Sequence, residues 1–447
     1  MCSIFQKVNV AVLFIAAISS LTCTRKIVSN NVKVTLQFDS IRVVTIDQGP
    51  YMIGPCEPSI SVSPVDQNRV VAGSVLDNYY VSGDGGKSWK KGKLKSAFGV
   101  YGDPVVKHTS TGRVLYGHLS NPMGKAYSSD EFLDRIVVQM SDDDGASWLE
   151  GSFPPCNYKT DHDKHWISAD PSSRSVLMSW TEFDKYGSKE LTDKSRILFS
   201  VSHDNGDTWS DALSISQIEG DCMDDDKTTE GAVPVVGVDG NYYVVWSHDS
   251  KIYLDKSTDR GKTWMTEDKV IASQPGGWSL DIPGIDRCNG MPVIKSDHSR
   301  SKYRGNLYVS WADQRSGAND TDIWCMSSPD GGKMWSQPVR VNNDPAGKHQ
   351  FFSAMDVDQA TGIIYFVFYD RRAYDTNYTD VWMAYSTDGG KTFENIKISE
   401  KPFLPEPTVF FGDYNDISAI NGIIRPIWTE QDGVRLKVKT AIVNVRK

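Results

Sequence analysis

Six copies of one eight-residue pattern recur along the chain, and they restrict it to folds built from a repeated unit. Each copy is close to Ser-x-Asp-x-Gly-x-Thr-Trp, as in STDRGKTW and STDGGKTF. The aspartates of the pattern are Asp84, Asp143, Asp204, Asp259, Asp330 and Asp388. They lie 59, 61, 55, 71 and 58 residues apart. A unit of roughly sixty residues is near the size of a propeller blade.

The residues between the copies predict four short strands per unit. In the fourth unit, VPVVGVD, YYVVW and KIYLDKS precede the pattern, and EDKVIAS follows it. Turns rich in Gly, Asp and Asn separate these runs, and the mature chain has no clear period of 3.6 residues. Within the pattern, the Asp accepts hydrogen bonds from nearby backbone N–H groups and the Gly allows a positive φ. The fold is predicted to be all-β, with the pattern as a structural turn.

The number of units predicts a closed ring. After the sixth copy, GDYNDISAI, IIRPIWTEQ and RLKVKTAIVNV predict three strands without the pattern, and residues 32–43 predict one strand before the first unit. Pairing this N-terminal strand with the C-terminal three makes a β-propeller of seven blades, with six blades as the alternative. Residues 24–447 are then a single propeller domain.

The first residues predict export. An apolar run from Val8 to Ile18 is too short to cross a membrane but has the length of a signal-peptide core. Residues 1–23 are therefore interpreted as a signal peptide. Cys23 is a candidate for lipidation, and Arg25 and Lys26 after it favour an outer-membrane lipoprotein; simple cleavage and secretion is the alternative.

Composition excludes several other classes of function. A formal net charge of -9 over 447 residues gives no basic surface for nucleic acid, and a membrane contact is expected only through the lipid anchor. No Cys or His spacing predicts a zinc site, so no cofactor is expected; calcium at the acidic run Asp221–Asp226 has no supporting loop pattern. In an exported chain, Cys56, Cys156, Cys222 and Cys288 predict one or two disulfides. A monomer is expected.

The repeated pattern resembles the Asp-box (BNR) repeats of the sialidase, or neuraminidase, superfamily, and the resemblance covers essentially the whole mature chain. It implies an exo-glycoside hydrolase acting on extracellular glycans. Asp-boxes also occur in enzymes that cleave arabinan and xyloglucan and in receptors without catalysis, so the resemblance specifies the fold better than the activity.

The resemblance also implies where a site would lie, in the segments that enter each innermost strand and in the loops after each second strand. These segments contain the candidates Glu57, Asp103, His165, Glu230, Asn289, Asp413, Tyr414, Asp77, Arg315, Arg371 and Arg372. By resemblance, Tyr414 is the nucleophile, Glu230 its partner and Asp77 the acid. The candidates for binding the substrate are Arg315, Arg371, Arg372, Asp103, Glu57, His165 and Asp413.

The chain departs from the family pattern at the arginines that hold a sialic acid carboxylate. Cys56-Glu57-Pro58 stands where the family has Arg-Ile-Pro, and Ser247 and His248 stand where its second arginine is expected. A non-catalytic glycan- or protein-binding lipoprotein therefore remains an alternative. A lyase acting on uronate polymers, with His165 or His248 as base and Arg315 on the carboxylate, is a third hypothesis.

Each candidate also has a purely structural interpretation. Glu57, Asp103 and Glu230 suit the capping of backbone N–H groups in turns. Arg315 and Arg371 suit salt bridges with Asp313 and Asp370 between blades. Tyr414 suits a packed position on a strand.

Overall fold

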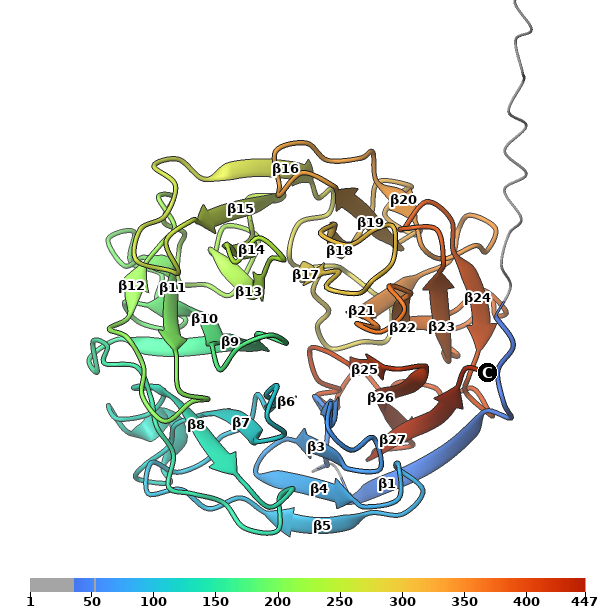
Figure 1. Cartoon of the computed structure of the whole chain (residues 1–447), viewed down its shortest axis with the longest axis horizontal. Coiled ribbons are helices and arrows are strands. Elements are labelled where there is room, and N and C mark those ends of the chain that lie inside the picture. Colours follow the sequence, from blue (N-terminus) through green and yellow to red (C-terminus); the bar gives the residue numbers. More distant parts are fainter. Residues whose placement is uncertain (1–35, 52–53, 447) are drawn as a thin grey trace, which may run out of the picture. The chain divides into compact units, whose positions relative to one another are not determined.

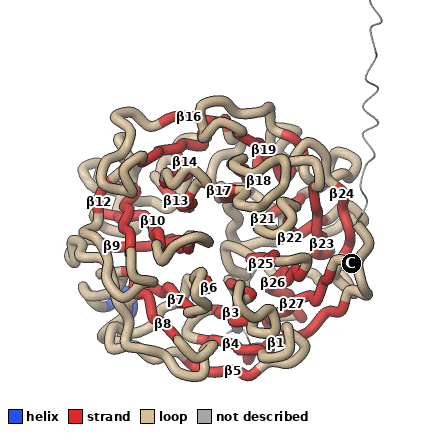
Figure 2. Tube along the Cα trace, viewed as in Figure 1, coloured by secondary structure: helices blue, strands red, loops and turns tan. Residues whose placement is uncertain are grey.

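Short β-strands joined by tight turns build seven antiparallel sheets around a common axis (Figures 1 and 2). The computed structural model describes residues 36–51 and 54–446. Within these ranges the only helix is a single 3-10 turn, Ala126–Ser128. Among the described residues, no helix has the length and hydropathy needed to cross a membrane. The predicted all-β propeller of seven blades is confirmed.

Each blade is a meander whose first strand is the innermost. The first three blades are β2 (Ser59–Val62), β3 (Val70–Ser74), β4 (Asn78–Ser82) and β5 (Lys90–Lys93); β6 (Val105–His108), β7 (Val114–Leu119) and β8 (Ile136–Ser141); and β9 (Asp161–Ala169), β10 (Val176–Phe183), β11 (Ser195–Ser202) and β12 (Leu213–Ser214). The next two are β13 (Glu230–Val236), β14 (Tyr242–His248), β15 (Lys251–Ser257) and β16 (Lys269–Ser273); and β17 (Val293–Ser296), β18 (Leu307–Asp313), β19 (Asp322–Ser328) and β20 (Val339–Arg340). The sixth is β21 (Gln350–Val357), β22 (Ile364–Asp370), β23 (Asp380–Ser386) and β24 (Glu394–Lys397).

The seventh blade joins the two ends of the described chain. It contains β25 (Asp416–Ile420), β26 (Ile423–Asp432), β27 (Arg435–Asn444) and, as its outermost strand, β1 (Arg42–Tyr51). The predicted closure by an N-terminal strand is confirmed, but the predicted bounds of 32–43 are wrong. The strand begins at Arg42, and before it only Phe38 makes an isolated bridge, to Val445. Cys23, the predicted signal peptide and residues 32–35 lie outside the described residues.

The strands are buried on both faces because each sheet packs between two neighbours. The second strands β10, β14, β18 and β26 carry the fully buried Trp180, Trp246, Trp311 and Trp428. Residues this large fill the wedge between adjacent blades and hold the sheets in place.

The six repeated turns share one hydrogen-bonded geometry. In every copy the Ser hydroxyl donates to Oδ1 of the Asp at 2.7–2.9 Å and accepts the N–H of the Gly at 2.8–3.0 Å. That Gly has φ between 81° and 92°, a conformation that other residues rarely adopt. The ring at the end of each copy packs against a core cluster. The turns therefore fix the end of the third strand in each of the first six blades; the second of these blades has no fourth strand among the described residues.

Strand register places these turns far from the start of the innermost strands. In the fourth blade, Glu230 pairs with Ser247 at one end of the sheet, and Tyr242 pairs with Ser257, the first residue of a repeated turn, at the other. Two faces of the ring result: an entry face, where the innermost strands begin, and a turn face, which carries the repeated turns.

The expected disulfides are absent from the described residues, where all five cysteines are free. Two of the thiols lie close to backbone carbonyl oxygens. Sγ of Cys156 lies 3.9 Å from the carbonyl oxygen of Asp134, and Sγ of Cys288 lies 3.8 Å from that of Asn289. The four expected cysteines lie in segments that precede different blades.

Candidate active site

Three charged residues on the entry face have a left-handed backbone. Glu57, Asp103 and Lys164 have φ of 51°, 49° and 51°. Glu57 and Asp103 each lie two residues before an innermost strand, and Lys164 lies within β9. This conformation costs a residue other than glycine of order 1–3 kcal/mol, and such residues concentrate at functional sites. Asp224 also has this conformation, with φ of 56°, and so do Asp144, Asn205 and Arg260 in the repeated turns, so the backbone conformation by itself does not single out the entry face.

Asp413, just before β25, contacts two of these residues, Glu57 and Lys164, and also Arg287. Its carboxylate accepts a hydrogen bond from Lys164 Nζ at 2.5 Å and from Arg287 Nε at 2.8 Å, and Arg287 Nη2 makes a further contact. Its backbone N–H donates to Glu57 Oε1 at 3.1 Å. Burial alone would raise the pKa of Asp413, but Lys164 and Arg287 outweigh it and lower that pKa. Asp413 is thus ionised at neutral pH and held by two cations.

Arg287 links this carboxylate to a second acidic group. Its Nη1 donates to Asp224 Oδ2 at 2.8 Å, and the Tyr186 hydroxyl donates to the same oxygen at 2.6 Å. The Arg287 side chain is 43% exposed, while that of Asp224 is 8% exposed. Arg287 therefore forms the solvent side of the site, above carboxylates that solvent barely reaches.

The carboxyls nearest to these ion pairs have raised pKa values. Burial, followed by the charge of Asp413, raises the pKa of Glu57 to about 7. Burial and then Glu57 raise the pKa of Asp103 well above its ordinary value. A set of carboxyls with separated pKa values can contain both a proton donor and a proton acceptor at neutral pH.

Tyr414 lies among these carboxyls. Its side chain is 7% exposed, and its hydroxyl donates to the backbone oxygen of Pro104 at 3.3 Å. Burial raises its pKa well above the ordinary value, and the charges of Asp103 and Glu57 raise it further. Among the acidic groups, those two carboxyls, rather than Glu230 or Asp77, raise the pKa of Tyr414 most.

Glu230, the first residue of β13, is fully buried on the other side of the ion pairs. Neither of its carboxyl oxygens accepts a hydrogen bond from a donor among the described residues. Burial and then the charge of Asp224 raise its pKa well above the ordinary value. We call the set Glu57, Asp103, Asp163, Lys164, Asp224, Glu230, Arg287, Asp413 and Tyr414 the charged cluster.

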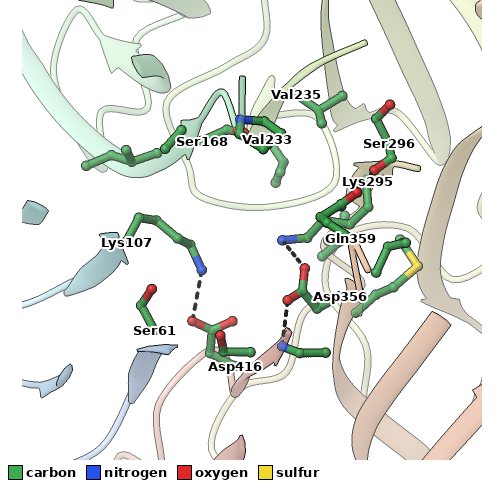
Figure 3. A pocket seen from close by; sticks show the side chains of 18 of the residues that line it. Ser61, Lys107, Ser168, Val233, Val235, Lys295, Ser296, Asp356, Gln359 and Asp416 are labelled. Carbon is green, nitrogen blue, oxygen red and sulfur yellow. Dashed lines mark hydrogen bonds and ion pairs between the residues drawn. The ribbon is translucent and has the colours of Figure 1, made fainter. Parts of the chain in front are cut away.

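An apolar layer separates the charged cluster from a cavity of about 250 Å³ along the central axis. Trp166 and Met291 line this cavity and also pack with Trp278 and Tyr414. Figure 3 shows the cavity walls, where Lys107 pairs with Asp416 and Lys295 with Asp356, each at 3.3 Å. The cavity is lined by the ends of the innermost strands, on the turn face.

Asp77, the expected acid, has a different environment. It pairs with Lys93 of β5, the outermost strand of the first blade, and its side chain is 33% exposed. His165 is 2% exposed, neither ring nitrogen has a hydrogen-bond partner among the described residues, and burial lowers its pKa to about 3. Neither side chain makes a hydrogen bond to the charged cluster within the described ranges.

The three candidate arginines each have protein partners of their own. Arg315 bonds Asp313 and stacks on Trp324, and Arg372 bonds Asp370 and stacks on Trp382. Arg371 has no carboxylate partner among the described residues. Its guanidinium donates to the Pro283 carbonyl oxygen, the Thr379 hydroxyl and Asn377 Oδ1.

Sequence reasoning missed both cations of the charged cluster. Lys164 lies in the sequence DKHWIS and Arg287 in DRCNG, but a lone basic residue in a turn carries no distinctive signal. Asp224 belongs to the acidic run considered for calcium; its carboxylate accepts bonds from Tyr186 and Arg287. Within the described ranges, no group of three or more His, Cys, Asp or Glu side chains is arranged to hold a metal ion.

Comparison with known proteins gives structural neighbours only. No family model matches the sequence, and no curated protein does. Among solved structures, the chain is similar to a protein of unknown function from Dyadobacter fermentans, at 13% identity and a TM-score of 0.49, over 91% of this chain and 99% of that one.

Two further neighbours are sialidases. NanB sialidase from Streptococcus pneumoniae is 10% identical, with a TM-score of 0.47, over 84% of this chain and 83% of that one. Trypanosoma rangeli sialidase is 13% identical, with a TM-score of 0.44, over 79% of this chain; the match spans 56% of that longer enzyme.

Proposed function

We propose that the protein is a glycoside hydrolase that acts on glycans outside the cell, with its active site in the charged cluster. The observation that carries the proposal is the position of Tyr414: its hydroxyl bonds the carbonyl oxygen of Pro104, next to Asp103, and the N–H of the preceding residue, Asp413, bonds Glu57. Glu57 is buried and Asp103 is half-buried, and the pKa of each is raised. Fold resemblance alone would not support an activity, because propellers carry many functions.

In the proposed reaction, Tyr414 Oη attacks the anomeric carbon and its proton passes to Glu57. Asp103, in its protonated form, gives its proton to the oxygen of the departing alcohol as the glycosidic bond breaks. Burial and the charge of Glu57, which raise the pKa of Asp103, favour that form. Water then attacks the glycosyl–tyrosine bond and gives a proton to Asp103, while Glu57 returns its proton to Tyr414. These roles replace the expected partners Glu230 and Asp77 with the carboxyls that act most strongly on Tyr414.

The test is hydrolysis of a panel of aryl glycosides of both anomers, sialosides included. We expect turnover of at least one substrate. Glu57→Gln and Asp103→Asn should each lower kcat about 10²- to 10⁴-fold, the usual contribution of general acid–base catalysis, and Tyr414→Phe should abolish turnover. Asp77→Asn is the matched control. Activity that survives Tyr414→Phe would exclude the proposed nucleophile.

A binding protein without catalysis is the second candidate. It is favoured by the hydrogen bonds that the site already makes within the protein. Asp413 has two cationic partners, and the Tyr414 hydroxyl has an acceptor. Glycan binding without turnover by any substrate of the panel would support it.

A further inference from the structure

Both cations of the charged cluster are already neutralised by aspartates of the protein. Lys164, whose side chain is 6% exposed, bonds Asp413, and the guanidinium of Arg287 is divided between Asp413 and Asp224. Two positive charges thus face two carboxylates in buried or half-buried ion pairs. A ligand anion would have to compete with these carboxylates for the same donors.

Four further carboxyls surround these pairs without an ion-pair partner among the described residues. They are Glu57, Asp103, Asp163 and Glu230, and burial is the first cause of the raised pKa of each. An acidic ligand would need a cation to balance its charge, and both cations of the cluster already have carboxylate partners. At the low effective dielectric of such a site, an unbalanced charge costs more than a single hydrogen bond recovers.

Sugar hydroxyls suit the same surroundings. A hydroxyl donates and accepts, so it satisfies a carboxyl in either protonation state. Tyr127 is 71% exposed and packs edge-on against the ring of Tyr101, two residues before Asp103, with ring centroids 6.4 Å apart. Its ring offers an apolar face on which a sugar ring can stack.

From these contacts we infer that the site takes uncharged glycosides and rejects sugars that carry an acidic group. The inference rests on the proposed function for the identity of the site, but it concerns the charge of the ligand. It departs from the expectation of a sialic acid substrate. Arg315 and Arg372, two of the arginines expected to hold an acidic group, are paired with Asp313 and Asp370. Arg371 bonds backbone and side-chain oxygens through Nε and Nη1, while its buried Nη2 has no hydrogen-bond partner among the described residues.

The experiment compares matched substrates that differ only in the acidic group. Hydrolysis of 4-nitrophenyl glucoside and galactoside is measured beside 4-nitrophenyl glucuronide and galacturonide, with the aryl N-acetylneuraminide included. We expect kcat/KM to be at least about tenfold higher for the uncharged member of an active pair. Equal or faster cleavage of the acidic member would overturn the inference.

Two variants test whether the charge of the cluster sets this preference. Asp224→Asn removes one carboxylate that neutralises Arg287, and we expect the ratio between uncharged and acidic substrates to fall about threefold or more. Asp225→Asn makes the same change one residue along the same loop, where the side chain is exposed, and should leave the ratio unchanged. An unchanged ratio in a folded Asp224→Asn protein would contradict the inference.

Equilibrium binding of the wild-type protein to immobilised neutral and acidic glycans distinguishes the two proposals. If no glycoside is cleaved but neutral glycans bind, hydrolysis is excluded and the inference stands. If acidic glycans bind preferentially, or if no glycan is bound and none is cleaved, the inference fails.

Discussion

Asp413 joins segments from four blades, because its carboxylate and backbone contact Lys164, Arg287, Asn289 and Glu57. Lys164 and Asp413 are 6% and 4% exposed. At such burial the pair adds little stability compared with apolar packing, but loss of one partner leaves an uncompensated charge. Removal of the Asp413 carboxylate should therefore destabilise the folded protein.

Asp413→Asn should lower the free energy of unfolding by about 3–5 kcal/mol, because Lys164 would remain charged and buried. The pKa of Asp413 is lowered in the folded state. Its stabilising effect is therefore present above the unfolded pKa near 4 and is lost as the pH falls through the folded pKa. Urea denaturation of the wild type and the variant at pH 7 and pH 3 measures the loss of stability and its dependence on pH.

Asp375→Asn serves as the control, because that carboxylate is fully exposed and should contribute no measurable stability. An equal loss of stability at both pH values for Asp413→Asn would show that its charge is not responsible.

Glu57→Gln tests the proposed proton acceptor through the pH profile. Glu57 must be ionised to take the tyrosine proton, and its pKa is raised to about 7. The wild-type kcat should therefore rise with pH through about 7. In Glu57→Gln this rise of kcat near pH 7 should be absent, and kcat should be about 10²- to 10⁴-fold lower.

Glu430→Gln is the matched control, since Glu430 pairs with Lys439 away from the charged cluster. A limb near pH 7 that persists in Glu57→Gln would assign the titration to another group.

At the scale of elements, the repeated turns and the charged cluster occupy opposite ends of the blades. Ser257→Ala removes a buried hydroxyl that donates to Asp259 and accepts the N–H of Gly261. We expect the free energy of unfolding to fall by about 1–3 kcal/mol, the cost of leaving buried groups unpaired. kcat/KM should not change.

Thr258→Ala alters the next residue of the same turn, whose side chain is exposed, and should be neutral in both measurements. A drop in kcat/KM for Ser257→Ala without a drop in stability would contradict a purely structural turn.

The pattern of strands was predictable because each repeated turn makes its own local hydrogen bonds. Asp259 and Ser257, for instance, need only their neighbours in the chain. The closing strand was placed about ten residues too early, because its register depends on pairing with β27 rather than on its own sequence.

Prediction of the site was partial for the same reason. Glu57, Asp103, Glu230, Asp413 and Tyr414 were predictable from their places before or at the start of innermost strands. Lys164 and Arg287 were not predictable, because their roles depend on contacts with Asp413. Asp413 lies 249 residues from Lys164 and 126 residues from Arg287 in the chain.

At the scale of the whole molecule, the ring is closed by one pair of strands from opposite ends of the chain. β1 pairs with β27, with Thr45 opposite Lys439. Every other blade is made of consecutive strands. A crosslink across this pair therefore restricts almost the whole unfolded chain, whereas a crosslink inside another blade restricts only a hairpin.

A disulfide between Thr45→Cys and Lys439→Cys should raise the free energy of unfolding more than one between Lys251→Cys and Ser273→Cys. Both pairs lie opposite each other on outer strands. The first closes a loop of roughly 390 residues and the second one of roughly 20, so chain entropy predicts a difference of about 2–3 kcal/mol in favour of the first. Urea denaturation of each double variant, oxidised and reduced, gives the two gains. Equal gains would mean that the unfolded chain keeps its ends together, or that the seventh blade opens before the ring unfolds.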